Sequence, residues 1–188
     1  MFKPFGSFIA FIIIFLISSE FKGSNLNITD LDTSAGLTSK YGFSVVAPIK
    51  IIAPSMLLAV KEIETEPYPG FPTDMQSLLL PVLCRAEGSS CICERVFSSR
   101  FRTVCELKKM GADIRITDDG QCARIRGGCR LRGAAVDAPD LRGGAALIIA
   151  ALGAEGITVI NDTCHIQRGY EQIPETIRLL GGEACWLS

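Results

Sequence analysis

The sequence contains little histidine, few aromatic residues and almost no net charge. Its 188 residues include one histidine, one tryptophan and 7% aromatic residues, and the formal net charge is −1 at pH 7. Such a balance excludes the strong electrostatic attraction to nucleic acid that a basic domain has. With 48% hydrophobic residues and 18 glycines, the chain is long enough for one domain with a core and is typical of an α/β fold with many tight turns.

The cysteines lack the spacing of a metal site. There is no Cys-x-x-Cys pair, and the single histidine, His165, cannot complete the usual zinc patterns, so we expect no metal. Cys91 and Cys93 share one face of an expected strand, which is poor geometry for a local disulfide. We expect reduced, buried cysteines and therefore a cytosolic compartment. The eight cysteines are Cys84, Cys91, Cys93, Cys105, Cys122, Cys129, Cys164 and Cys185.

The N-terminal residues favour a different compartment. Residues 5–18 form an apolar run without charge, shorter than the roughly 20 residues that a membrane-spanning helix needs. This run is compatible with a signal sequence or anchor, with sequence foreign to the domain, or with a buried strand. Residues 22–38 have the composition of a linker. We expect residues 1–40 to lie outside the domain and residues 41–188 to form it.

A rigid loop precedes the first expected helix. Residues 67–72 contain three prolines and one glycine, which restrict the chain to extended and turn conformations. Thr73 is a typical N-cap residue and residues 75–80 are mostly apolar, so a helix is predicted to begin here and to reach Arg85. Asp74 then lies in its first turn, either as a general base or as an acid that complements the helix dipole.

The rest of the chain contains an internal repeat. Gly88 and Gly156 are 68 residues apart, and each falls in the same order of helix, strand, loop and helix. We expect two related units, at about residues 73–112 and 139–182. The strands of the two units are expected at residues 91–96 and 157–161. Further extended segments are predicted at residues 43–46, 49–52, 112–117, 122–126 and 130–136.

Three arginines occupy positions where an anion could bind. Arg142 lies in the first turn of an expected helix, which is unfavourable for a cation unless an anion lies beside it; a pair with Asp140 or a solvated side chain is the alternative. Arg100 and Arg168 follow strands at equivalent positions of the two units, either in site-forming loops or as ordinary exposed residues. Asp140 is a helix cap or an orienting carboxylate, and His165 is a loop residue or a catalyst.

Five motifs occur together in an order found in one family. They are residues 67–76 (PYPGFPTDMQ), 96–101 (VFSSRF), 110–113 (MGAD), 140–142 (DLR) and 165–170 (HIQRGY). Together they closely resemble the UDP-N-acetylglucosamine 1-carboxyvinyltransferases, which are enolpyruvyl transferases. The ten-residue loop is specific to these enzymes and argues against their relatives that act on shikimate 3-phosphate. The resemblance covers roughly residues 57–186, less than half of the family's chain.

The resemblance implies a fold and a reaction. The family has two similar domains, each an inverse α/β barrel of three repeated units, with the active site between them. It transfers the enolpyruvyl group of phosphoenolpyruvate to the 3′-hydroxyl of UDP-N-acetylglucosamine, the first committed step of peptidoglycan synthesis, and uses no cofactor. A cytoplasmic transferase with these two substrates is therefore expected. Membrane contact is expected only through residues 5–18, which would anchor or export the chain if they are functional.

The resemblance also implies roles for individual residues. Asp74 is expected to be the general base near the sugar hydroxyl and to contact the nucleotide sugar together with Val96 and Phe97. Asp140 is expected to support the site. The residues expected to bind phosphoenolpyruvate are Arg100, Arg142 and Arg168.

The same resemblance predicts what the chain lacks. The family's first domain has no counterpart here, and with it are missing an asparagine, a lysine and the cysteine loop that closes over phosphoenolpyruvate. We therefore expect a C-terminal piece that is inactive alone, or a non-catalytic module that binds the nucleotide sugar or a partner. Its exposed domain interface is expected to favour self-association.

Overall fold

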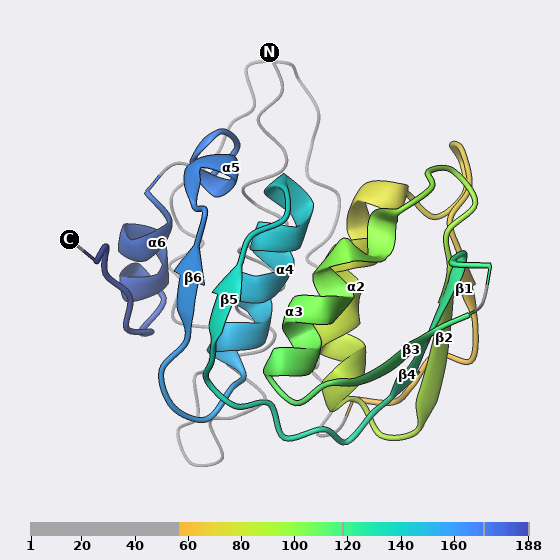
Figure 1. Ribbon diagram of the computed structural model, residues 1–188, viewed down its shortest axis with the longest axis horizontal. Helices are drawn as coiled ribbons and strands as arrows, with labels where there is room; N and C mark the ends of the chain where they lie inside the picture. The colour runs from red at the N-terminus through yellow and green to blue at the C-terminus, as the bar shows by residue number, and fades with distance from the viewer. Residues whose placement is uncertain (1–56, 118, 171, 188) are drawn as a thin grey trace, which may run out of the picture.

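The computed structural model describes residues 57–117, 119–170 and 172–187, which form two sheets with helices between them (Figure 1). The predictions for residues 1–40, 43–46 and 49–52 lie outside the described residues. The helices are α2 (Thr73–Arg85), η2 (Arg100–Arg102), α3 (Thr103–Lys109), α4 (Leu141–Leu152), α5 (Cys164–Gln167) and α6 (Ile173–Leu179). The strands are β1 (Ile63–Glu64), β2 (Ser89–Cys93), β3 (Asp113–Ile116), β4 (Cys122–Arg126), β5 (Ala135–Asp137) and β6 (Val159–Asn161). No helix in these residues is long and apolar enough to cross a membrane.

The larger sheet has four strands in the order β1-β2-β4-β3. β1 runs parallel to β2, whereas β4 is antiparallel to both β2 and β3. The strands predicted at residues 112–117 and 122–126 are confirmed as β3 and β4, because alternate residues such as Ala123 and Ile125 are buried in the core. β5, the last part of the segment predicted at 130–136, forms a separate parallel pair with β6.

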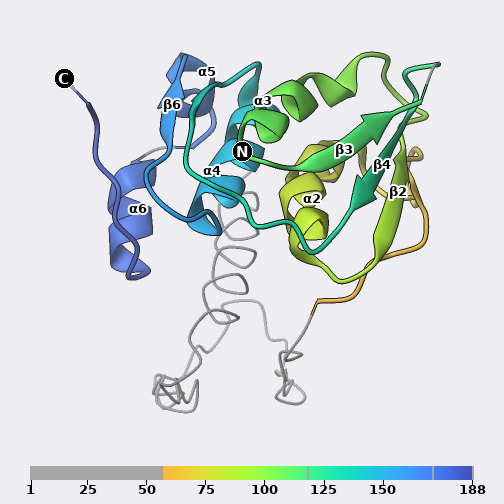
Figure 2. The same ribbon diagram turned by 60° about the horizontal axis from the view of Figure 1, so that its bottom comes forward.

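The helices α2, α3 and α4 lie between the two sheets (Figures 1 and 2). α2 and α3 both pack against α4. Residues 143–150 of α4 are all buried, as expected for a helix that is apolar on every side. Leu80, Leu107 and Leu147, from the three helices, share one core with Ile92 of the sheet. Helices inside and strands outside are the arrangement of an inverse α/β barrel, present here in part, since the described strands do not close.

The helix predicted from residue 73 to Arg85 is confirmed as α2, but the N-cap role of Thr73 and the predicted end of the next strand are wrong. α2 has Pro72 as its N-cap and begins at Thr73, because the Thr73 hydroxyl donates to Glu94 at 2.8 Å rather than accepting from its own helix. The strand expected at residues 91–96 ends at Cys93, because the Glu94 side chain holds the following residues in a turn. Both differences have the same cause: the Glu94 carboxylate accepts hydrogen bonds from Thr73 at the start of α2 and from the backbone that follows β2.

The prediction that the cysteines are reduced and buried is also wrong. Cys93 and Cys122 form a disulfide, because the register of β2 and β4 places them directly opposite each other. Spacing along the sequence does not show that register. Of the six free cysteines only Cys84 is buried, and Cys105, Cys164 and Cys185 are exposed. The cysteines therefore give no support to a cytosolic compartment.

Candidate active site

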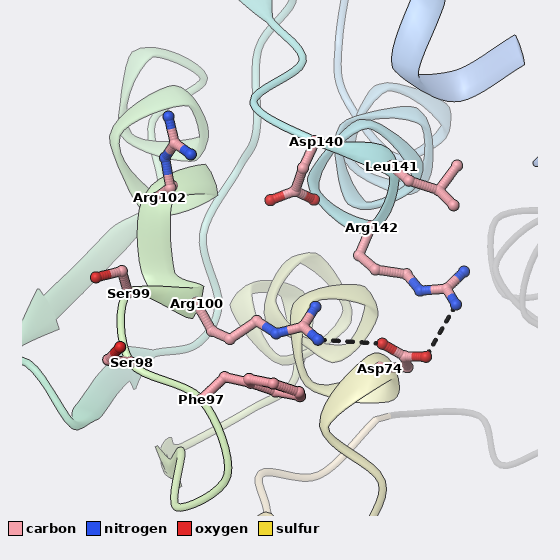
Figure 3. A pocket seen from close by; sticks show the side chains of 9 residues that line it. All are labelled: Asp74, Phe97, Ser98, Ser99, Arg100, Arg102, Asp140, Leu141 and Arg142. Carbon is pink, nitrogen blue, oxygen red and sulfur yellow. Dashed lines mark hydrogen bonds and ion pairs between the residues drawn. The ribbon is translucent and has the colours of Figure 1, made fainter. Parts of the chain in front are cut away.

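A carboxylate lies between two guanidinium groups at the start of α2 (Figure 3). Arg142 Nη2 donates to Asp74 Oδ2 at 2.9 Å, and Arg100 Nη2 donates to Asp74 Oδ1 at 3.3 Å. The side chains of Arg142, Arg100 and Asp74 are 19%, 21% and 37% exposed. The hydrogen bond from Arg142 lowers the pKa of the Asp74 carboxyl below its usual value; partial burial opposes this, and the charges of both arginines add to it. Asp74 is thus ionised and doubly ion-paired.

These side chains border an open pocket of about 460 Å³. Its lining residues are Asp74, Phe97, Ser98, Ser99, Arg100, Arg102, Asp140, Leu141 and Arg142. Figure 3 shows Arg100, Arg142 and Asp74 converging, whereas Arg102 points away from the carboxylate. The lining has more arginines than aspartates, and both aspartates already accept hydrogen bonds. Such a lining favours an anion over a metal cation.

The packing of α2 against α4 brings Asp74 and Arg142 together. They are 68 residues apart and are the second residues of α2 and α4. The two helices pack on each other, so residues at the same position of each helix meet. Gly143 permits a close approach of α4 to α3, since a Cβ atom at this position would collide with Thr103. The division of the chain into two related units stays a prediction.

Asp140 is a helix cap. Its Oδ1 accepts from the backbone N–H of Gly143 at 2.8 Å, which satisfies a donor that the first turn of α4 leaves open. Arg142 Nη1 also donates to the Tyr170 hydroxyl at 3.3 Å. Of the two roles predicted for Asp140, this hydrogen bond matches the helix cap. Asp140 therefore affects the pocket by holding the first turn of α4, the helix that carries Arg142.

Glu94 is a residue of this site that the sequence reasoning missed. It is 4% exposed, and its carboxylate accepts from the hydroxyls of Thr65 and Thr73, each at 2.8 Å. It also accepts from the backbone N–H groups of Val96 and Phe97 at 2.9 and 3.0 Å. Burial raises the pKa of the Glu94 carboxyl, but these hydrogen bonds outweigh it and the net shift is downward. The signal was a charged residue at an inward position of the alternating pattern.

The turn fixed by Glu94 delivers an aromatic ring to the pocket. Phe97 is 53% exposed, and its ring centre lies 4.8 Å from the guanidinium carbon of Arg100, within range of a cation–π interaction. Val96 is exposed too, but it is not among the described residues that line the pocket. Phe97 thus supports Arg100 from below (Figure 3) and leaves an apolar surface open.

Arg168 and His165 are not among the described residues of the pocket lining. The loop predicted after β6 contains the short helix α5, which starts after Thr163 and buries Ile166. Arg168 follows α5 as its C-cap and is exposed. The role predicted for Arg168 in binding phosphoenolpyruvate stays a prediction.

Comparison with known proteins gives the family of this fold. Residues 43–177 match the family described as EPSP synthase (3-phosphoshikimate 1-carboxyvinyltransferase). UDP-N-acetylglucosamine 1-carboxyvinyltransferase 1 of Legionella pneumophila (strain Lens) is 54% identical over 119 residues, which are 63% of this chain and 23% of the relative. UDP-N-acetylglucosamine 1-carboxyvinyltransferase 2 of Caldanaerobacter subterraneus subsp. tengcongensis is 48% identical over 135 residues, 72% of this chain and 32% of the relative.

A solved structure agrees with these sequence relatives. The enolpyruvyl transferase NikO from Streptomyces tendae superposes with a TM-score of 0.63 at 30% identity, covering 69% of this chain and 30% of that chain. The chain thus spans about a quarter to a third of the length of the proteins it matches. Because the family match covers well over half of its residues, the chain belongs to the EPSP synthase family of enolpyruvyl transferases, and it is similar to the UDP-N-acetylglucosamine 1-carboxyvinyltransferases within it.

Proposed function

We propose that this chain supplies one wall of an enolpyruvyl transferase active site. The reaction moves the enolpyruvyl group of phosphoenolpyruvate to the 3′-hydroxyl of UDP-N-acetylglucosamine and releases phosphate, in the cytoplasm, as a step of peptidoglycan synthesis. The names of the relatives support this choice of substrates. The observation that carries it is the carboxylate of Asp74 held between Arg100 and Arg142 at an open pocket.

The two guanidiniums suit the donor substrate. Phosphoenolpyruvate carries a carboxylate and a phosphate, and planar guanidiniums bind both groups with paired hydrogen bonds. Arg142 and Arg100 are already directed toward one carboxylate, that of Asp74. Arg168, exposed after α5, would also bind phosphoenolpyruvate. Donors placed where negative charge develops stabilise the transition state with little reorganisation.

Asp74 must change partners before it can act as a base. Its pKa is held down by the arginines, so in the ligand-free site it is a weak proton acceptor. The incoming phosphoenolpyruvate anion competes for Arg100 and Arg142 and adds negative charge nearby, and both effects raise the pKa of Asp74. The carboxylate can then accept the proton of the sugar hydroxyl as its oxygen bonds to C2 of phosphoenolpyruvate and C3 takes up a proton. Phosphate then leaves C2 while C3 loses a proton, which restores the double bond in the product. Binding of the donor thereby prepares the base.

The acceptor substrate, UDP-N-acetylglucosamine, is expected to lie on the side of the pocket that Phe97 forms. Phe97 offers an exposed aromatic face beside Arg100, suitable for packing on a sugar or a base. Val96, exposed next to it, would extend this surface. Glu94 holds the turn that carries both residues, and Asp140 holds the helix that carries Arg142.

A binding module without catalysis is the second candidate. It is favoured by one observation, that the chain spans only about a quarter to a third of its relatives. A pocket with one wall can hold an anion or a nucleotide sugar and still lack the groups that complete the transfer. The two candidates share their ligands and differ in turnover.

Two measurements on the full chain test the proposal. Phosphate release from phosphoenolpyruvate and UDP-N-acetylglucosamine measures turnover, and none is expected from the chain alone. Turnover that disappears in Asp74→Ala would contradict that expectation and support catalysis by this chain. Calorimetry measures binding of each substrate, and no binding of either one would remove both candidates.

The exchange of partners at Asp74 has its own test. In Asp74→Asn the two arginines lose their internal counter-ion, so phosphoenolpyruvate should bind more tightly. A charged hydrogen bond contributes roughly 1.5–3 kcal/mol, so the expected gain is about 10-fold or more in affinity. The matched control is Asp162→Asn, which removes the charge of an exposed acid outside the pocket lining and should leave the affinity unchanged. Weaker binding in Asp74→Asn would show that the carboxylate does not compete with the ligand.

A further inference from the structure

The outer face of the four-stranded sheet carries three cysteines, which we call the three-cysteine cluster. Cys91 and Cys93 are alternate residues of β2, and Cys122 of β4 lies directly opposite Cys93. Ile92, between the first two, is fully buried in the core, so the sulfurs project from the other face of the sheet. The three Sγ atoms lie within 4.8 Å of one another. None of these residues lines the candidate active site.

The spacing of the cluster suits a metal–thiolate centre. The Sγ atoms of Cys91 and Cys93 are 3.9 Å apart. A tetrahedral zinc site with metal–sulfur bonds of about 2.3 Å has sulfurs about 3.8 Å apart. Two of the three sulfurs therefore already have the separation of ligands on one ion. The third, of Cys122, is joined to Cys93 by the disulfide and becomes a ligand only after reduction.

A carboxylate is available as a fourth ligand. Glu64 of β1 and Glu62, which precedes β1, lie beside Cys93, and their carboxylate oxygens lie within 4.8 Å of each other and of Cys93 Sγ. Glu64 is paired with Arg95 at 3.0 Å, whereas no such pair of Glu62 is seen among the described residues. Both glutamates are exposed and Cys91 is half-buried, so an ion can reach the cluster from solvent.

We propose that the reduced three-cysteine cluster, with the carboxylate of Glu62, binds a thiophilic divalent cation such as Zn²⁺ or Cd²⁺. Thiolate ligands select such ions over Mg²⁺ or Ca²⁺. Disulfide and cation compete for the same sulfurs, so the site binds metal only in reducing conditions. It is separate from the anion-binding pocket and does not depend on the proposed transferase function.

The chemistry balances with a dithiol as reductant. The dithiol cleaves the bond between Cys93 and Cys122, each of these sulfurs gains one electron and one proton, and the dithiol becomes its own disulfide. The cation then displaces one proton from each of the three thiols and forms three metal–sulfur bonds. The resulting site is negative overall, and Arg124, which pairs in register with Cys91, offsets part of that charge.

Cadmium titration of the full chain tests the site. The chain is reduced with a phosphine, freed of reductant under nitrogen and titrated with Cd²⁺ alone, while the ultraviolet thiolate-to-cadmium absorption is recorded. We expect saturation at one ion per chain. The oxidised chain should bind more than about 100-fold more weakly, since changing even a group that only orients a ligand costs about 10–100-fold. A reduced chain that binds no better than the oxidised chain overturns the proposal.

Substitutions then locate the ion. Cys91→Ser leaves the disulfide partners intact and should weaken binding more than about 100-fold, and Glu62→Gln about 10-fold. Cys105→Ser and Cys164→Ser change exposed thiols outside the cluster and are the matched controls. Circular dichroism checks that each variant is folded, and exposed Glu62 gives a variant with little risk to folding. Equal affinity in Cys91→Ser and the parent chain, or loss of the absorption in a control, overturns the assignment.

Discussion

The loops that follow β2 and β6 begin with an acid at equivalent positions and build different surfaces. Glu94 and Asp162 are 68 residues apart. Glu94 is buried and accepts two hydroxyl and two backbone hydrogen bonds, whereas Asp162 is exposed with a φ of 54°. Downstream, Arg100 reaches the Asp74 carboxylate, but Arg168 remains exposed at the end of α5.

The difference shows why the first loop contributes to the pocket and the second does not. A carboxylate buried among N–H and O–H donors fixes a turn, because leaving those donors unpaired would cost free energy. That turn places Phe97 and Arg100 at the pocket. The second loop has no such anchor among its described residues. The helix starts show the same pattern, since the equivalent positions of α2 and α4 hold Asp74 and Arg142, which form an ion pair.

The largest effect is expected where the first loop is anchored. Glu94→Gln keeps the size of the side chain but brings amide hydrogens toward the hydroxyl and N–H donors around it. We expect the free energy of unfolding in urea to fall by about 2–3 kcal/mol. The matched control is Asp162→Asn in the second loop, where a change within about 0.5 kcal/mol is expected. Equal losses at both positions would contradict the contrast between the loops.

The next effect is a difference between Arg142 and Arg168 in their contribution to phosphoenolpyruvate binding. Arg142→Ala removes a guanidinium from the pocket and should weaken phosphoenolpyruvate binding by about 10–100-fold, the value of one charged hydrogen-bonded contact. Arg168→Ala should change the affinity of this chain by less than about twofold, because its side chain is exposed outside the pocket lining. Calorimetry on both variants measures this. A large loss in Arg168→Ala would mean that the ligand recruits the second loop as well.

The sequence predicted the parts of the site that depend on local signals. The extended segments predicted at residues 112–117 and 122–126 are β3 and β4, and the loop chemistry placed Asp74 in the first turn of α2. Pairing across the chain was not visible in the same way. The disulfide of Cys93 and Cys122 depends on strand register, and Glu94 is satisfied by donors from a segment about 30 residues away as well as by its neighbours.

A smaller effect is expected at the cap of α4. Asp140→Ala should lower the free energy of unfolding by about 1 kcal/mol, the usual contribution of an N-cap side chain. It should also weaken phosphoenolpyruvate binding, since α4 carries Arg142. Asp140→Ser restores a cap acceptor and should recover most of both losses in unfolding and calorimetry. α2 has no side-chain cap hydrogen bond, so the two helix starts differ in this respect as well. Full stability in Asp140→Ala would show that packing alone holds the first turn of α4.

The smallest effect is the pH dependence of the ion pairs of Asp74. Its pKa is lower in the folded chain than its usual value, so its pairs stabilise the fold fully above about pH 4, the unfolded pKa. Below that pH the unfolded chain takes up the proton first, and the contribution is lost as the pH falls toward the folded pKa. The gap in unfolding free energy between the parent and Asp74→Asn should therefore shrink from pH 6 to pH 3, roughly. Because the side chain is 37% exposed, solvent screening limits the gap to about 1 kcal/mol or less. When Arg142→Ala is present in both proteins, the difference in unfolding free energy caused by Asp74→Asn should be smaller at every pH. A difference that grows on acidification would show that the two arginines do not stabilise the Asp74 charge.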